Sequence, residues 1–493
     1  MNYIGFSSGF HDAAVSVIDN DGNILFAGHS ERYSGIKHDK RIDSEIMADA
    51  MFRVKGDFEV HYYEKPFLKY LRQLRAGEKP SLSSLNPRNS LSYLANMFLK
   101  DKKIHTHSHH LSHAAGSFQS SPFDDATVVV IDAIGEFETI SIYDATYVNG
   151  VAKYKKLWNK TYPDSIGLFY SAMTKRVGLK PLDEEYILMG MAAYGEPKYY
   201  TDIHIDMLES TREIDFKYNL HLGVDDEFLS GANNMDIAAS SQLMVEHLIE
   251  NVMRKAKQLG KSKNLVYSGG VALNCLANRL LGKYFEQIWI MPNPGDAGSS
   301  LGAAALGYGG RINFSSASLG HCIPGEYPVN DLLDELLTRK IVGVASGHAE
   351  FGPRALGNRS LLGDPRGIHI KEQVNAIKKR QQFRPFAPVI LEELVDEYFI
   401  MPDNWRDSRY MQVICTCRRP DLFPAIVHHD GTSRVQTVPK DGSGIRELLE
   451  KWYMLTECPM LLNTSLNIRG EPMVNDRSDA DRFEKLYNVK VKS

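Results

Sequence analysis

Three short strands joined by two tight polar connections open this chain, and this pattern constrains its fold more than any other feature. Apolar runs at residues 3–7, 14–18 and 24–27 predict the strands. The tip Gly9-Phe-His-Asp12 joins the first two strands, and the turn Asn20-Asp-Gly22 joins the last two. An Asp-Gly pair between apolar runs strongly indicates a β-hairpin. The start of the chain therefore predicts an antiparallel unit with the carboxylate of Asp12 at its tip.

The same pattern returns further along the chain. Strands are expected at residues 127–131, 139–143 and 151–154, with Asp132-Ala-Ile-Gly135 as the polar tip and Asn149-Gly150 as the turn. Two such copies indicate the duplicated halves of the actin-like ATPase fold, in which each tip points into the cleft between the halves. This inference is an analogy at the level of the fold, and a repeated hairpin alone is weak support for it.

Length and composition limit the class of protein. A chain of 493 residues exceeds what one hydrophobic core usually serves, so two or three domains are expected. The net charge of −4 gives no reason to expect binding to nucleic acid or to an anionic membrane. The five cysteines lack zinc-ribbon or redox spacing, and no secretory signal or membrane span is visible. A cytoplasmic enzyme with reduced thiols is the expectation.

The middle of the chain predicts strand–turn–helix units. Residues 237–259 form an amphipathic helix that Asp236 can cap at its start and Gly260 at its end. A strand at residues 264–267 leads into Ser268-Gly-Gly-Val-Ala-Leu-Asn274. A second turn, residues 293–298, leads into a segment of small residues. Units of this type present backbone N–H groups at the start of a helix.

A Gly- and Ser-rich break at residues 309–319 places the domain boundary near residue 313. We therefore expect one domain at residues 1–312 and a second, mixed α/β domain at residues 313–493. In the second domain the pattern predicts one helix, residues 329–337, and several strands: residues 341–345, 410–416, 434–438 and 460–462.

Two histidines four residues apart suggest a metal site. On a helix His109 and His113 lie on one face and can share an ion, and Asp132 and Asp296 stand at two predicted turns. Two His and two Asp suit a divalent metal with open positions for substrate. Several alternatives stay open: nearby His105 and His107 allow other pairs, a histidine pair is commonly solvated, and either Asp can be an ordinary turn or cap residue.

The paired glycines Gly269 and Gly270, followed by Val271 and Asn274, suggest a nucleotide lying against the backbone. A tight connection between a strand and a helix explains them equally well. The segment is neither a Walker sequence, since no Gly-Lys-Ser/Thr follows, nor a Rossmann fingerprint.

A basic constellation spreads over the second domain. The loop Glu350-Phe-Gly-Pro-Arg-Ala-Leu-Gly-Asn-Arg-Ser360 carries Arg354 and Arg359 among turn residues, which suits an oxyanion better than a protein core. Other members that can help to cage a phosphate and a polar carbonyl compound are Lys378, Lys379, Arg380, Arg384, Arg434, Asn463, Ser465 and Arg469. Lys378–Arg380 alone would pass for a solvated helix face.

Taken together, these residues closely resemble the O-carbamoyltransferases of the tobramycin, cephamycin and nodulation-factor type. The resemblance runs from Tyr3 to about Ala480 and is specific because many modest motifs occur in order. The matching segments are Gly9–Ala14, Ser30–Arg32, Lys37-His38, His109–Ala114, Leu188–Gly190, Ala193–Gly195, Gly269–Asn274, Gly295–Gly298, Glu350–Ser360, Arg384–Pro388, Asp430–Val438, Leu462–Ser465 and Arg469–Pro472.

The resemblance implies an α/β protein of two domains. The first is an actin-like ATPase-fold domain similar to tRNA threonylcarbamoyltransferases, and the second is similar to threonylcarbamoyl-adenylate synthases. It also implies a reaction in two steps: carbamoyl phosphate and ATP, with Mg²⁺, give carbamoyl-adenylate in the second domain, and the first domain transfers the carbamoyl group to a hydroxyl of an acceptor.

The resemblance also assigns residues. A divalent ion, with Fe²⁺ as the expected metal, would bind His109, His113, Asp132 and Asp296. Contacts to carbamoyl phosphate would come from Lys378, Arg384, Arg434 and Ser465, with Arg354 and Asn463 also at the substrate and nucleotide site. Asp12 would bind the acceptor, and His38 belongs to the same catalytic set. On local sequence alone, Asp12 is about as well explained as a turn-stabilising residue.

Two positions depart from the family, since Ile187 replaces a usual lysine and His348 a common arginine. They bear on acceptor binding and on the anion contacts.

The expected partners are carbamoyl phosphate, ATP and a hydroxylated small molecule, with a homodimer left open. The alternatives are carbamoyl or threonylcarbamoyl transfer to tRNA, which the lack of a basic stripe opposes, and a nucleotide-binding module without turnover.

Overall fold

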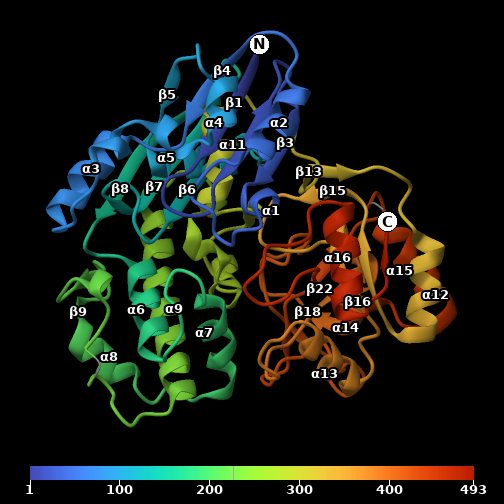
Figure 1. The fold of residues 1–493 in the computed structure, drawn as a ribbon. Helices are drawn as coiled ribbons and strands as arrows, with labels where there is room; N and C mark the ends of the chain where they lie inside the picture. Colours follow the sequence, from blue (N-terminus) through green and yellow to red (C-terminus); the bar gives the residue numbers. More distant parts are fainter. Residues whose placement is uncertain (226, 443) are drawn as a thin grey trace.

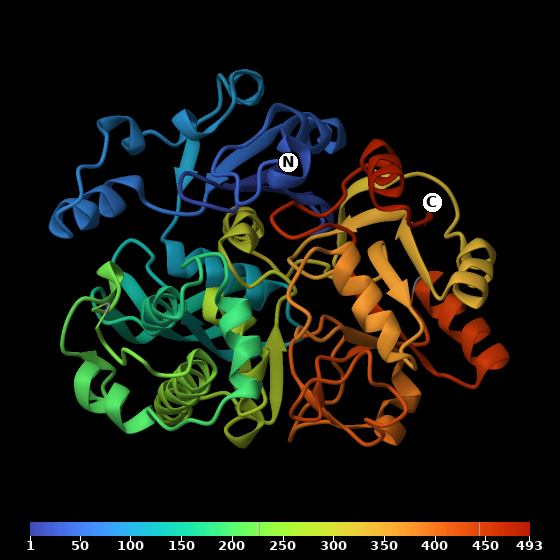
Figure 2. The same ribbon diagram turned by 60° about the horizontal axis from the view of Figure 1, so that its bottom comes forward.

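The computed structural model describes residues 1–225, 227–442 and 444–493 and shows two lobes side by side (Figures 1 and 2). The blue-to-green lobe holds two five-stranded sheets, and the orange-to-red lobe is built around a six-stranded sheet. No helix of the described residues has both the length and the apolar character needed to cross a membrane.

The two five-stranded sheets have the same strand order. The first runs β3-β2-β1-β4-β5, in which β1–β3 form an antiparallel meander and β4 and β5 add in parallel. The second runs β8-β7-β6-β11-β12 with the same directions. The duplication predicted from the two strand patterns is therefore confirmed. The bounds are β1 Asn2–Ser7, β2 Ala14–Ile18, β3 Ile24–His29, β4 Phe58–Tyr62, β5 Ile104–Thr106, β6 Asp125–Ile131, β7 Glu138–Val148, β8 Val151–Thr161, β11 Asn264–Ser268 and β12 Gln287–Ile290.

Two helices, α5 (His109–Gln119) and α11 (Ser299–Tyr308), pack against each other between the two sheets, with α11 on the first sheet and α5 on the second. Small residues make this contact close: a Cβ on Gly302 would stand 1.8 Å from the carbonyl oxygen of Ser112. The segment of small residues noted in the sequence thus forms α11, which provides the close contact with α5. The close packing brings the start of α5 beside the turn that precedes α11, where Asp296 lies.

The long helix α9 (Asn234–Leu259) buries one face in the core of the second sheet. Its cap differs from the prediction, because Asn233 rather than Asp236 accepts a hydrogen bond from the first turn. Asp236 lies inside that turn and instead binds the N–H of Glu196 at 2.8 Å. Gly260 does follow the helix, with extended rather than left-handed backbone.

The other elements of this lobe lie around the sheets: α1 Glu31–Ser34, α2 Ser44–Arg53, α3 Pro66–Arg75, α4 Tyr93–Phe98, α6 Ile166–Arg176, α7 Glu185–Met191, α8 Tyr200–Met207, β9 Leu208–Ser210, β10 Asp215–Phe216 and α10 Cys275–Asn278.

The second lobe is a mixed α/β unit. Its main sheet runs β21-β17-β22-β16-β14-β23, with smaller sheets β13-β15 and β18-β19-β20. Apolar residues between Ile323 and Val491 form its core. The elements are β13 Ser318–Ile323, α12 Val329–Arg339, β14 Ile341–Ala345, β15 Gly347–Glu350, β16 Arg359–Gly363, α13 Ile368–Ile377, β17 Ala387–Leu391, α14 Val395–Tyr398, β18 Phe399–Ile400, β19 Cys415–Cys417, β20 Thr432–Ser433, β21 Gln436–Val438, α15 Gly444–Thr456, β22 Met460–Ser465, α16 Arg477–Tyr487 and β23 Val491–Lys492. The boundary between residues 312 and 313 stays a prediction.

The predicted strand at residues 410–416 is mostly wrong, because only its last two residues enter a strand, β19. Met411 has a left-handed backbone with φ of 56°, which a β-strand does not accommodate. The apolar side chains Val413 and Ile414 are buried all the same, in the cores of the second and first lobes respectively.

Arg359 does not belong to an anion site, which corrects the expectation for the Glu350–Ser360 loop. It starts β16, its side chain is fully buried, and its guanidinium donates to five backbone carbonyls. These are Asn475 (3.0 Å), Ser346 and Asn358 (2.9 Å each), His321 (3.1 Å) and Gly347 (3.2 Å). With its N–H groups used in this way, Arg359 ties loops of the second lobe together.

Arg359→Lys is therefore expected to lower the melting temperature by several degrees, because an ammonium cannot reach five separate carbonyls and leaves buried acceptors unsatisfied, at about 1–3 kcal/mol each. Calorimetry of the purified proteins measures this. Arg482→Lys is the matched control, since that side chain is 67% exposed. An unchanged melting temperature in Arg359→Lys would contradict the structural role.

Candidate functional site

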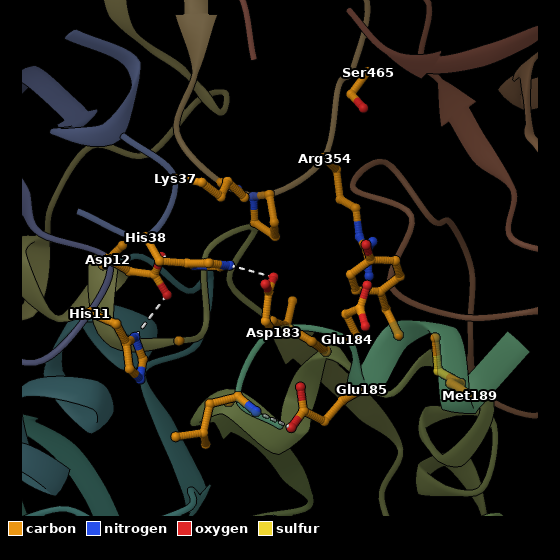
Figure 3. A pocket seen from close by; sticks show the side chains of 18 of the residues that line it. His11, Asp12, Lys37, His38, Asp183, Glu184, Glu185, Met189, Arg354 and Ser465 are labelled. Carbon is orange, nitrogen blue, oxygen red and sulfur yellow. Dashed lines mark hydrogen bonds and ion pairs between the residues drawn. The ribbon is translucent and has the colours of Figure 1, made fainter. Parts of the chain in front are cut away.

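A cavity of about 510 Å³ lies between the two lobes and collects most of the predicted site residues (Figure 3). The first lobe contributes one wall and the second lobe the other. The predicted residues that line it are Asp12, His38, Asp132, Gly270, Val271, Asn274, Asp296, Arg354, Lys378, Arg380, Arg384, Arg434, Asn463, Ser465 and Arg469. Because both lobes contribute, a molecule in this cavity contacts both domains.

The four predicted metal ligands come together beside the first-lobe wall. The first turns of α5 hold His109 and His113 on one face, Asp132 follows β6, and Asp296 follows β12. The His109 and His113 Nε2 atoms are 3.1 Å apart, and Asp132 Oδ2 is 3.0 Å from His109 Nε2. Asp296 Oδ1 is 3.3 Å from His113 Nε2. One ligand atom from each residue lies within 4.8 Å of all the others.

The chemistry of this cluster fits a divalent cation. Burial opposes ionisation of Asp132, yet the hydrogen bonds from His109 and His113 lower the pKa of its carboxyl well below the usual value. Two carboxylates and two imidazole nitrogens thus meet in a buried place, and among the described residues no lysine or arginine pairs with them. A donor set of this kind suits a transition metal with open positions and does not by itself select iron.

His105 and His107 do not compete for this cluster. His107 Nε2 lies 3.0 Å from Nδ1 of His61, and the ring of His105 stacks on His61 with centroids 5.2 Å apart. The alternative histidine pairs of the sequence therefore lie elsewhere.

Asp12 belongs to a line of hydrogen-bonded groups that reaches into the cavity (Figure 3). Its Oδ1 is 2.7 Å from His38 Nδ1 and its Oδ2 is 2.9 Å from His11 Nδ1. His38 Nε2 continues the line to Asp183 Oδ1 at 2.8 Å, and His11 Nε2 lies 3.9 Å from Asp296. Asp12 thus faces the metal cluster from the opposite hairpin, and among the described residues its carboxylate bonds these two rings rather than its own backbone.

Charge on this line is set by its neighbours. Burial opposes the imidazolium of His38, but hydrogen bonds to Asp12 and Asp183 raise its pKa to about 9. Burial likewise opposes ionisation of Asp12, and the hydrogen bonds from His11 and His38 lower its pKa well below the usual value. At neutral pH the Asp12 carboxylate is therefore ionised and held in place.

Three arginines converge on the other wall without acidic partners. Arg354 follows β15, Arg384 precedes β17, and Arg434 precedes β21. Among the described residues no acidic side chain forms an ion pair with them, and the guanidinium of Arg384 lies 4.7 Å from the ring centre of Tyr186. Burial and the neighbouring Arg434 lower the pKa of Arg354. Arginine keeps its charge in proteins, so this wall fits a bound anion.

Lys378 and its neighbours have mixed roles. Lys378 Nζ donates to the carbonyls of Ser465 and Asn467 at 2.5 and 2.8 Å, so it supports the 465–467 loop that lines the cavity. Arg380, predicted as a member of the basic set with a solvated helix face as the alternative, lines the cavity and binds Asn375 Oδ1 at 2.6 Å. Lys379 lies over Tyr487 instead. That Lys378 and Ser465 contact carbamoyl phosphate stays a prediction.

The two interpretations of the paired glycines were a tight connection between a strand and a helix, and a backbone surface for a nucleotide. Gly269 fits the first, and Gly270 is placed where the second is possible. A Cβ on Gly269 would stand 2.1 Å from the carbonyl oxygen of Ile131, so this glycine allows β11 to approach the tip of β6. Gly270 lines the cavity and donates its N–H to Asp132 Oδ1 at 3.1 Å. Asn274 caps α10 and bonds Gln242. Nucleotide binding here stays a prediction.

The sequence did not single out His11 or Asp183 as site residues. His11 precedes Asp12 in a tip already thought to enter the cleft, and this position was a usable indication. Asp183 lies in an irregular segment before α7, where no periodicity or spacing marks it. Of the two unusual positions, Ile187 is buried in α7, and His348 of β15 bonds the carbonyl oxygen of Gly320 in β13. Neither lines the cavity.

Comparison with known proteins places the chain. The family description "Carbamoyltransferase N-terminus" matches residues 63–305, and "Carbamoyltransferase C-terminus" matches residues 333–491. An uncharacterised protein of Synechocystis sp. is 32% identical over 97% of this chain and 93% of its own length. The nodulation protein NolNO of Sinorhizobium fredii is 30% identical over 95% of this chain and 76% of its own length.

Solved structures are more distant. HypF from T. kodakarensis aligns with a TM-score of 0.34 and 16% identity, over 62% of this chain and 47% of that one. Component A of (R)-2-hydroxyglutaryl-CoA dehydratase from Acidaminococcus fermentans gives 0.33 and 16%, over 62% of this chain and 98% of that one. Scores this low carry no argument. By its sequence relatives and by both family descriptions, the chain belongs to the carbamoyltransferase family.

Proposed function

We propose that this protein is an ATP-dependent O-carbamoyltransferase acting in two steps. Water first removes phosphate from carbamoyl phosphate, and the carbamate oxygen attacks the α-phosphorus of ATP, which gives carbamoyl-adenylate and pyrophosphate. An acceptor hydroxyl then attacks the carbamoyl carbon, its oxygen forms the new ester bond, and AMP leaves. The acceptor is a hydroxylated small molecule such as a sugar, an antibiotic or a nucleoside-like compound.

One observation carries this proposal: three arginines of the second lobe line the same cavity as Asp132 and Asp296, two of the four predicted metal ligands. Arg354, Arg384 and Arg434 are cations without acidic partners among the described residues, which suits carbamoyl phosphate and the phosphates of ATP. Their charge would also stabilise the pyrophosphate that leaves. A module that only binds a nucleotide needs one of the two constellations, so their combination favours the enzyme.

On the opposite wall, His109, His113, Asp132 and Asp296 would hold a divalent ion, with Fe²⁺ expected from the family. When bound, such an ion would supply positive charge to the nucleotide phosphate and the carbonyl oxygen. Asp12, ionised and oriented by His11 and His38, would accept a hydrogen bond from the acceptor hydroxyl and take its proton. The surrounding cavity wall would keep bulk water from the carbamoyl group.

A small acceptor fits the molecule better than tRNA. The net charge is −4, whereas a protein that binds RNA through its phosphates carries a basic surface. The cationic side chains of the second lobe that line the cavity stand inside it rather than along an exposed stripe. The sequence and the cavity are thus both consistent with a small hydroxylated acceptor, which we expect to be met in the cytoplasm.

Replacing either imidazole tests the metal assignment. His109→Ala and His113→Ala are each expected to lose the bound metal and carbamoyl transfer, because each removes one of four ligands. Metal analysis of the purified variants measures the first effect and mass spectrometry of the acceptor the second. His105→Ala, whose ring stacks on His61 outside the cluster, is the control and should keep both. Full metal occupancy with normal transfer in both cluster variants would refute the assignment.

The arginine wall is tested by the binding of one substrate. Arg384→Ala and Arg434→Ala are each expected to weaken carbamoyl-phosphate binding by about 10- to 100-fold, since a hydrogen bond to a charged group contributes roughly 1.5–3 kcal/mol. Isothermal calorimetry measures this, with metal content unchanged. Arg419→Ala, half-exposed near Asp421, is the control. Unchanged affinity in both wall variants would place the anion elsewhere.

A further inference from the structure

Two buried carboxylates lie behind His109 and have no part in the chemistry described so far. Glu64 follows β4 and is 3% exposed, and Glu136 follows the tip of the second hairpin and is 4% exposed. A buried carboxylate costs free energy unless it is paired or serves a site. Both carboxylates lie next to His109, which indicates that they act on this histidine.

The two oxygens of Glu64 are used differently. Oε1 accepts hydrogen bonds from Lys69 Nζ at 2.8 Å and from the Tyr62 hydroxyl at 3.2 Å. Oε2 instead faces Nδ1 of His109 at 3.7 Å. That Nδ1 is buried and has no hydrogen-bond partner within reach among the described residues. The carboxylate is thus anchored through one oxygen and presents the other to an unsatisfied ring nitrogen.

Glu136 fixes the distance between the backbone next to Glu64 and the backbone of His109. Its Oε1 accepts the backbone N–H of Lys65 at 2.8 Å and the backbone N–H of His109 at 3.0 Å. The peptide that follows Glu64 and the peptide of His109 are therefore joined through one oxygen atom. Ser108, the residue in the capping position of α5, makes no side-chain cap, so Glu136 also serves the start of this helix.

We propose that Glu64 is a positioning residue for His109, which it orients with Nδ1–H toward its own Oε2 and the Nε2 lone pair toward Asp132 and Asp296. The inference rests on the proposed metal centre. A carboxylate behind a ligating histidine fixes its tautomer and makes the ligating nitrogen more basic. A movement of the ring by about 0.5 Å would bring the 3.7 Å Nδ1–Oε2 distance to the upper end of hydrogen-bond length, about 3.2 Å.

His113 is held differently, which makes the two histidines unequal. Its Nδ1 donates to the carbonyl oxygen of Pro294 at 3.1 Å, a neutral acceptor. Both rings therefore present Nε2 to the cluster, but only His109 has an anionic partner behind it. We expect His109 to be the more basic ligand of the pair.

Glu64→Gln tests this role, because it keeps the size of the side chain and removes the charge. The affinity of the metal-free protein for Zn²⁺, measured by competition with a chromophoric chelator, is expected to fall about 10- to 100-fold. Glu59→Gln is the matched control, since Glu59 lies in β4, just before Glu64, with its side chain 44% exposed, and the change should leave the affinity unchanged. Calorimetry with carbamoyl phosphate should give wild-type binding in both variants.

A second variant separates positioning from packing. Glu64→Asp keeps the negative charge and is expected to bind Zn²⁺ more tightly than Glu64→Gln, whereas a role limited to packing predicts the weaker site in the shortened side chain. Equal Zn²⁺ affinity in the wild type and in Glu64→Gln would overturn the role of Glu64 and leave the metal centre standing. A wild-type protein that binds no divalent metal would overturn both.

Discussion

Holding the half-buried Arg354, Arg384 and Arg434 beside one another costs free energy, and no carboxylate of the described chain pairs with them to offset it. Charges taken out of water repel one another and lose hydration, so a fold tolerates them where a ligand completes the site. Lys378 secures the 465–467 loop at the wall, and Arg359 ties the loops behind it through five carbonyls. We interpret these three unpaired arginines as a binding site for an anionic substrate.

The first lobe contributes the opposite charge to the cavity, because its wall gathers carboxylates and imidazoles. Close packing of α5 against α11 brings His109 and His113 to the turn that carries Asp296, and β6 delivers Asp132. The duplicated hairpins point their tips at the same place, so that Asp12 meets this cluster through His11. The two walls differ in the sign of their charge and share one cavity, which is the geometry that the proposed two-step transfer requires.

The sequence predicted the features that local pattern controls. The repeated strand–tip–strand unit predicted the antiparallel strands β1–β3 and β6–β8 of the two sheets, and the i, i+4 spacing of His109 and His113 predicted their shared face. Features that depend on distant parts of the chain escaped it. In the sequence, Arg354 and Arg359 stand in the same glycine-rich segment and look equally suited to an anion site. Only the five backbone carbonyls around Arg359 show that it stabilises the fold instead. Asp183 and Glu64 act through partners more than forty positions away, and no spacing rule reports such contacts.

The central claim is that the two walls serve successive half-reactions, and exchange of labelled pyrophosphate into ATP tests it most directly. The account predicts exchange in the wild-type protein that requires carbamoyl phosphate and needs no acceptor. It also predicts that Arg434→Ala abolishes the exchange, while His113→Ala keeps it and loses only transfer. Wild-type protein that carbamoylates an acceptor without any such exchange would contradict the account.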